Sequence, residues 1–116
     1  MAPDNTVVQL VTIAAGASLS AATVKYPGYR LVGVQTAATW DAAKLTFQGS
    51  TDGVNFFNLF TATGEYEIAA VTAGACIALE FFNFVPWDYY KVRSGTAALA
   101  TSQVDATVLT LVLIPV

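Results

Sequence analysis

Residues 40–57 read WDAAKLTFQGSTDGVNFF, and this stretch predicts the fold class. Polar and apolar side chains alternate from Lys44 to Ser50, which is typical of a strand with one buried face. Leu45 and Phe47 fall on the expected core side, and the opposite side carries Lys44, Thr46, Gln48 and Ser50. Asp52-Gly53 supplies turn chemistry, because Asp can bond nearby backbone and Gly tolerates positive φ. The stretch therefore predicts a hairpin, with a second strand over residues 55–60.

Strand-like segments recur along the chain at intervals of roughly 8–12 residues, separated by turn residues. We expect strands over residues 6–14, 29–36, 44–50, 55–60, 65–71, 75–82, 88–94 and 104–114. This pattern indicates an all-β chain: one antiparallel β-sandwich domain, jelly-roll-like, spanning residues 1–116 with about eight strands. We expect residues 1–5 to form a flexible arm, the two terminal strands to lie close together, and the last strand to be central or covered. Residues 17–24 read as a loop, with a helix as the alternative, and Gly33 indicates a bulge or close backbone packing.

The composition is unusually poor in charge. Charged residues make up 11% of the 116 residues, against about 25% in ordinary soluble domains. A chain of this size exposes roughly 6,000 Å² of surface when folded, and only five basic and eight acidic residues are available to decorate it. Surfaces with so little charge usually mark contact regions, so we expect a subunit that is largely covered by neighbours.

The same composition argues against several classes of function. The net charge is −3 and the basic residues are scattered, which argues against nucleic-acid binding. No apolar run reaches 18 residues, so we expect no transmembrane helix. Residues 1–5 lack the basic and apolar regions of a secretory signal, so we expect the chain to stay in the cytoplasm until it assembles. Histidine is absent, which removes Ser-His-Asp and Cys-His sites and nearly every zinc site.

The remaining chemical candidates are weak. Glu65 and Glu67 stand two residues apart on one predicted strand, a spacing that general acid–base chemistry can use. The competing interpretation is a solvated strand face that discourages edge-to-edge pairing. Asp52-Gly53 lacks the dense oxygen ligands of a calcium loop, and Cys76 is expected to be a small buried residue. We therefore expect no catalytic residue, cofactor or metal.

The aromatic residues leave three interpretations open. An exposed sugar-stacking platform would comprise Trp40, Tyr66, Trp87, Tyr89 and Tyr90. Alternatively, Trp40 and Trp87 plug the ends of the sandwich core, since each precedes a predicted strand, or they contact another protein. Combining these aromatics with the polar side of residues 44–50 gives a candidate interface of Trp40, Lys44, Thr46, Gln48, Trp87 and Tyr89.

Three parts of the chain carry a resemblance to a known family. These are residues 40–53, the run Tyr90-Lys-Val-Arg-Ser-Gly-Thr96, and Gln103 before a Val/Leu-rich terminal strand. Together they resemble small β-sandwich virion structural proteins of tailed bacteriophages and prophages. The resemblance implies a capsid decoration or head spike/fibre-base subunit, with a place at the neck or tail as the other option, and it implies no catalytic residues.

This resemblance also sets expectations about partners and location. We expect the chain to bind the major capsid protein or other virion proteins and copies of itself, in a closed homo-oligomer with a trimer favoured. It would be assembled in the host cytoplasm and located in the virion, with no nucleic acid and no membrane among its partners. The alternative is a carbohydrate-binding or receptor-binding module of a phage tail or fibre.

Overall fold

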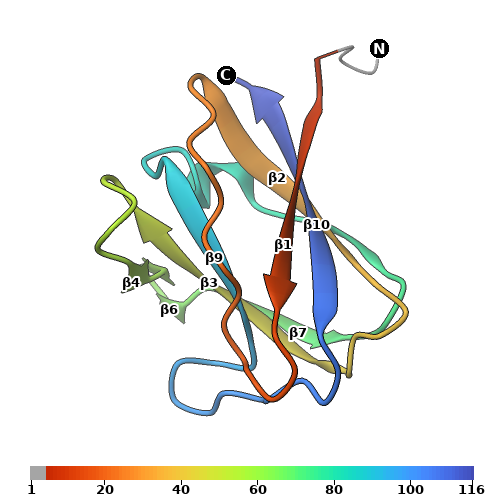
Figure 1. The fold of residues 1–116 in the computed structure, drawn as a ribbon. Coiled ribbons are helices and arrows are strands. Elements are labelled where there is room, and N and C mark those ends of the chain that lie inside the picture. The colour runs from red at the N-terminus through yellow and green to blue at the C-terminus, as the bar shows by residue number, and fades with distance from the viewer. Residues whose placement is uncertain (1–4) are drawn as a thin grey trace.

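Two antiparallel sheets face each other in the computed structural model, which describes residues 5–116 (Figure 1). The first, here called the β10 sheet, has the order β1 (Val7–Ile13), β10 (Thr107–Pro115), β2 (Tyr29–Thr36) and β8 (Cys76–Ala78). The second, the β3 sheet, is centred on β3 (Ala43–Ser50). One side of β3 pairs with β9 (Tyr89–Ser94), and the other with β4 (Phe57–Asn58) and β7 (Glu67–Val71). A small ribbon of β5 (Phe60–Thr61) and β6 (Gly64–Glu65) and a 3₁₀ helix, η1 (Phe81–Asn83), complete the elements. The chain is an all-β sandwich, as predicted.

The core lies between the two sheets and follows the alternation of the strands. Leu45 and Phe47 are fully buried, as predicted, and every second residue of β10 from Leu109 to Leu113 is buried opposite them. Phe84, from the loop after η1, packs edge-on against the rings of Phe47, Tyr66 and Tyr90. These four rings form an aromatic cluster within the buried core.

Predictions for the long strands are confirmed. Strands β1, β2, β3, β9 and β10 lie within two or three residues of their expected bounds. The terminal strands pair directly, with Val7 opposite Leu113, and β10 is central because β1 and β2 flank it. The irregularity expected at Gly33 is present as a register shift opposite Val112 and Leu113. Residues 17–24 contain no helix, so that alternative is wrong.

The predicted hairpin is only partly formed. Its first arm is β3, but the second arm shrinks to β4, which pairs with β3 only at Gln48–Asn58 and Gly49–Phe57. Residues 51–56 form a wide loop instead of a tight turn. The Asp52 carboxylate accepts hydrogen bonds from the backbone N–H groups of Val54 and Asn55, each at 2.8 Å. These amides hold the pKa of Asp52 well below its usual range, and Gly53 has φ 77°.

Two other expected strands are shorter than predicted. The segment over residues 65–71 divides into β6 and β7 at Tyr66, whose ring turns into the core. The segment over 75–82 ends as a strand at Ala78, and η1 replaces its second half. Cys76 is exposed, which corrects the prediction that it is buried. The physical reason is that β8 is the outermost strand of its sheet, and Cys76 lies on its outer side.

Residues 14–24 run between β1 and β9 and cover the outer edge of β9 (Figure 1). Ser20 N and Thr23 N donate to the carbonyls of Val92 and Tyr90. In return, the Ser20 and Thr23 hydroxyl oxygens accept from Val92 N at 2.9 Å and Tyr90 N at 3.0 Å. Side chains thus replace a regular strand along this edge. The predicted N-terminal arm falls mostly on residues 1–4, which lie outside the described residues; Asn5 is exposed.

Candidate interaction surfaces

The outer side of β3, predicted to contact solvent or a partner, is mostly occupied by the chain itself. Thr46 is fully buried and its Oγ1 donates to the Gly95 carbonyl at 2.8 Å. Ser50 is also buried, and its hydroxyl donates to Asp52. Lys44 is exposed and pairs with Glu67 at 3.0 Å. Gln48 is half-buried and donates to Asn58. The prediction of Thr46 as an interface residue is therefore wrong, because the loop after β9 covers it.

A buried ion pair that the sequence analysis missed organises that covering loop. Arg93 Nη1 lies 3.2 Å from Glu65 Oε2, and the two side chains are 10% and 13% exposed. Arg93 Nη2 also donates to Asn58 Oδ1 at 2.6 Å, and Glu65 Oε1 accepts from Ala97 N at 3.1 Å. The alternation of β9 places Arg93 on its outer side. Its partner could not be chosen from sequence, because Glu65 and Asn58 come from separate small elements.

The two tryptophans have different environments. Trp40 is 3% exposed, and its Nε1 donates to the Val71 carbonyl at 3.0 Å. Its expected role as a core plug is confirmed, and its place in the candidate interface is wrong. Trp87 is half-buried and lies against the backbone of β3, since a Cβ added at Gly49 would be 2.9 Å from the Trp87 ring.

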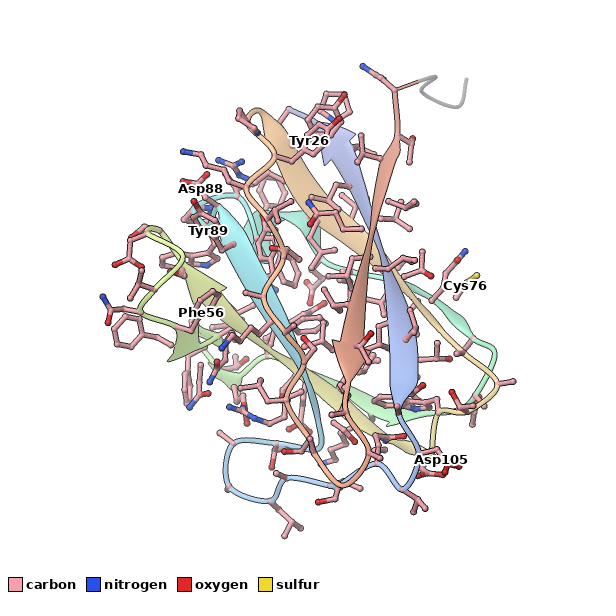
Figure 2. All side chains as sticks on the ribbon, viewed as in Figure 1. Tyr26, Phe56, Cys76, Asp88, Tyr89 and Asp105 are labelled. Atoms are coloured by element: carbon pink, nitrogen blue, oxygen red, sulfur yellow. The ribbon has the colours of Figure 1, made fainter. Side chains whose placement is uncertain are left out.

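The five predicted stacking aromatics do not form a surface platform. Trp40, Tyr66 and Tyr90 are buried. Tyr89 is half-buried over Gly53, and Figure 2 shows it with Asp88 and Phe56 on one side of the molecule and Cys76 on the other. Trp87 instead borders a hollow of about 300 Å³ with two aromatic side chains that sequence reasoning did not select: Phe57, 71% exposed, and Phe60, 62% exposed.

The outer face of the β10 sheet is a second surface that was not predicted. Alternation along the four strands directs these side chains outward: Val8, Leu10, Thr12, Val32, Gln35, Cys76, Ala78, Val108, Thr110, Val112 and Ile114. None of them is charged. Arg30, at one end of the face, donates to the Val85 carbonyl and lies 3.4 Å from Asp88. A hollow of about 330 Å³ lies over Val32, Gly33 and Cys76. We call this surface the outer β10 face.

The two candidate acid–base residues are both engaged. Glu65 is paired with Arg93, and Glu67 is paired with Lys44. They border a hollow of about 510 Å³ together with Glu80. Glu65 is not part of a solvated strand face, which corrects that interpretation. Paired with a cation in each case, neither carboxylate is placed as a free general base.

Two further features concern the described part of the chain as a whole. Among residues 5–116, no three Asp, Glu or Cys side chains lie close enough together to hold a metal ion. Within the same range, the structure contains no helix long and apolar enough to cross a membrane.

Comparison with known proteins gives no family assignment. Neither a scan against protein-family models nor a search of curated proteins found a match to this chain.

Proposed function

We propose that this chain is a structural virion subunit of a tailed bacteriophage or prophage. It acts as a capsid decoration or head spike/fibre-base protein that binds the major capsid protein and copies of itself. The observation that carries the proposal is the outer β10 face. Side chains from four strands form an uncharged surface there, in a chain that has little charge elsewhere. Contiguous apolar surface on a small chain is typical of a contact region.

The distribution of polar groups supports adhesion as the mechanism. Lys44, Arg93, Glu65 and Glu67 are paired within the β3 sheet and its covering loops. These four side chains lie on the β3 side of the sandwich, whereas the β10 sheet has one charged residue at the end of its outer face, Arg30, and that residue is paired with Asp88. A rigid sandwich of this kind binds by burying apolar area, which stabilises a contact by about 25 cal/mol per Å² before ordering costs.

The test uses purified virions of the phage or prophage that encodes this sequence. Mass spectrometry should find the chain in the particles at a fixed ratio to the major capsid protein. A lysine in place of Val108, on the outer β10 face, should lower its incorporation at least about tenfold. The matched control is Leu99→Lys, since Leu99 is 77% exposed on the loop after β9 and off this face. Absence of the chain from pure particles, or equal incorporation of both variants, would overturn the proposal.

The aromatic hollow favours a second candidate function, binding of a carbohydrate receptor. Trp87, Phe57 and Phe60 offer apolar ring surface that can stack on a sugar, and Asn58 lies among them. Titration with a glycan panel should change the fluorescence of Trp87, and Phe57→Ala should abolish the change. A panel with no response would remove this candidate.

A further inference from the structure

We propose that the Asp52-Gly53 bond is a latent site of isoaspartate formation and that the folded loop around Ser50 keeps it unreactive. The modification is spontaneous and needs no reactant other than water. This inference goes beyond the proposed function and does not depend on it, because the reaction is followed on the purified chain.

The sequence makes Asp52 the position most prone to this reaction. Among all Asp and Asn residues of the chain, it is the only one followed by glycine. Glycine has no side chain to hinder attack by its own backbone nitrogen, and it adopts many backbone conformations, so an Asp-Gly bond cyclises more readily than other Asp bonds. In the fold, Asp52 lies in an exposed loop, and Val54 beside it is 80% exposed. Water therefore reaches this bond, and burial does not protect it.

The reaction has two steps. In the first, the backbone nitrogen of Gly53 attacks Cγ of the protonated Asp52 carboxyl group. A C–N bond forms, the nitrogen gives up its proton, and the carboxyl OH leaves with that proton as water. In the second, water opens the resulting succinimide ring: addition at Cγ restores Asp, whereas addition at the main-chain carbonyl of Asp52 breaks its bond to Gly53 N and leaves the chain running through the side-chain carboxyl. One water leaves and one returns, so the mass of the chain is unchanged.

The nitrogen that would attack is already engaged in the folded loop. Gly53 N donates to Ser50 Oγ at 2.9 Å, and Asp52 N donates to the same oxygen at 3.2 Å. Gly53 has φ 77° and lies against the ring of Tyr89, since an added Cβ would be 2.9 Å from Cζ of that ring. To react, the Gly53 amide must release its proton and move toward the Asp52 side chain, and both changes break its hydrogen bond to Ser50.

The carboxyl group that would be attacked is engaged as well. Asp52 Oδ1 accepts from Ser50 Oγ at 2.9 Å, and Oδ2 accepts from Asn55 Nδ2 at 2.9 Å. Oδ1 also accepts from the N–H groups of Val54 and Asn55, each at 2.8 Å, so ring closure must turn the carboxyl group out of several bonds. These donors, the Asn55 and Val54 amides most of all, lower the pKa of Asp52 and favour the ionised carboxylate. An ionised carboxylate is a poor electrophile, because its oxygen does not leave as water.

Ser50 joins the two restraints. It is buried at the end of β3, its hydroxyl oxygen accepts from Gly53 N, and its proton is donated to Asp52 Oδ1. One side chain therefore restrains both reacting groups. For a virion subunit, which is not replaced after assembly, slow reaction at this bond prolongs the life of the particle.

The test follows isoaspartate in the purified chain at neutral pH and physiological temperature over several weeks. Endoproteinase Asp-N cleaves before Asp52 but not before isoaspartate, and mass spectrometry measures the two products. Ser50→Ala should form isoaspartate at position 52 at least about tenfold faster than the parent, because it frees both reacting groups. Thr51→Ala is the matched control, since the Thr51 hydroxyl makes no hydrogen bond within residues 5–116, and it should match the parent within about twofold.

Asn55→Ala, in the exposed part of the loop, keeps the test decisive if Ser50→Ala does not fold. It removes the side-chain bond to Asp52 Oδ2, so the expected rise is smaller, about two- to fivefold. The parent unfolded in urea gives the rate of the unprotected bond, which should exceed the folded rate at least about tenfold. Asp105, exposed in another loop, reports general unfolding and should react at the parent rate in every folded variant. Equal rates in the folded and unfolded parent, no rise in the folded variants, or an equal rise at Asp105 would each overturn the proposal.

Discussion

At the scale of single residues, the least predictable position is Gln103. It is completely buried, yet it follows a run of small residues that reads as a plain loop. Its Oε1 accepts from Asp41 N at 2.6 Å, and its Nε2 donates to Asp41 O at 3.0 Å and Ser94 Oγ at 2.9 Å. One side chain thus joins the segment before β3, the end of β9 and the approach to β10.

Replacing Gln103 with leucine should lower the free energy of unfolding by about 2–4 kcal/mol. The apolar side chain would leave the Asp41 backbone groups and the Ser94 hydroxyl buried without partners. Chemical denaturation monitored by circular dichroism measures the change. Ser102→Ala, at an exposed neighbouring position, is the control and should stay within about 0.5 kcal/mol of the parent. A leucine variant as stable as the parent would contradict this account of Gln103.

Tyr90 makes the stability of the fold sensitive to high pH. Burial raises the pKa of its phenol from 10.0 to about 12, and the hydroxyl donates to the Trp87 carbonyl at 2.7 Å. The folded chain therefore keeps the Tyr90 proton at a pH where the unfolded chain loses it. The stability from Tyr90 is complete below pH 10 and is lost as the pH rises from 10 to about 12.

Urea denaturation at several pH values between 9 and 12 checks this dependence. As the pH rises, the free energy of unfolding should fall faster for the parent than for Tyr90→Phe. The difference between the two slopes should be at most about 1.4 kcal/mol per pH unit. The phenylalanine variant should be less stable than the parent at pH 9, because it lacks the hydrogen bond to Trp87. Parallel pH profiles for the two proteins would show that Tyr90 does not carry the effect.

At the scale of elements, the sequence predicted a strand correctly where the alternation of polar and apolar residues is long and the strand pairs with a neighbour along most of its length. In β3, the alternation of Leu45 and Phe47 marks a strand that pairs along its length with β9. The predicted partner over residues 55–60 failed because β7 and β9 take most of the two edges of β3. Phe57 and Phe60 favour strand structure, but β3 has little unpaired edge left with which their segment could pair. Competition between distant segments decides this outcome, and local propensity contains no information about it.

The same limit applies to the candidate site. Residues on the outer side of β3 were correctly separated from the core side by periodicity, but the loop after β9 then covers Thr46. The uncharged outer β10 face was not selected, because it is assembled from strands at both ends and in the middle of the chain. Periodicity predicts which face of a strand is polar, whereas exposure depends on which loop lies over it.

The segment that covers β9 yields a prediction of its own. Ser20 and Thr23 supply the acceptors for the backbone N–H groups of Val92 and Tyr90, in a buried setting. Ser20→Ala and Thr23→Val should each lower the free energy of unfolding by about 1–3 kcal/mol, since a buried N–H loses its partner. Hydrogen exchange should also speed up at Tyr90 and Val92.

Ser18→Ala is a matched control, because Ser18 contributes its backbone carbonyl to Ser94 N and that bond survives the substitution. Exchange rates at Tyr90 and Val92 that match the parent in both variants would contradict the proposed role of the two hydroxyl groups.

At the scale of the whole molecule, several residues that carry the phage resemblance form hydrogen bonds between separate segments of the fold. Trp40 anchors to Val71, Thr46 to Gly95, and Gln103 to both Asp41 and Ser94. The motif therefore has a structural reason to exist in any sandwich of this design. The virion setting is the proposal that the resemblance adds, and it is argued from the outer β10 face, on which none of these motif residues lies.

If association with virion partners depends on the outer β10 face, it should respond to salt as an apolar contact does. The Debye length falls from about 10 Å at 0.1 M salt to about 3 Å at 1 M, which weakens contacts between exposed charges. Burial of apolar area is not screened in this way, and salts such as sulfate strengthen it. Particles carrying the chain should therefore retain it in 1 M NaCl with less than about a threefold loss, as measured by pelleting and mass spectrometry.

Particles placed in ammonium sulfate at equal ionic strength should retain the chain at least as well. A loss of tenfold or more in NaCl would mean that charged side chains such as Lys44 and Lys91, on the β3 sheet, make the contact, and that the outer β10 face is not the binding surface.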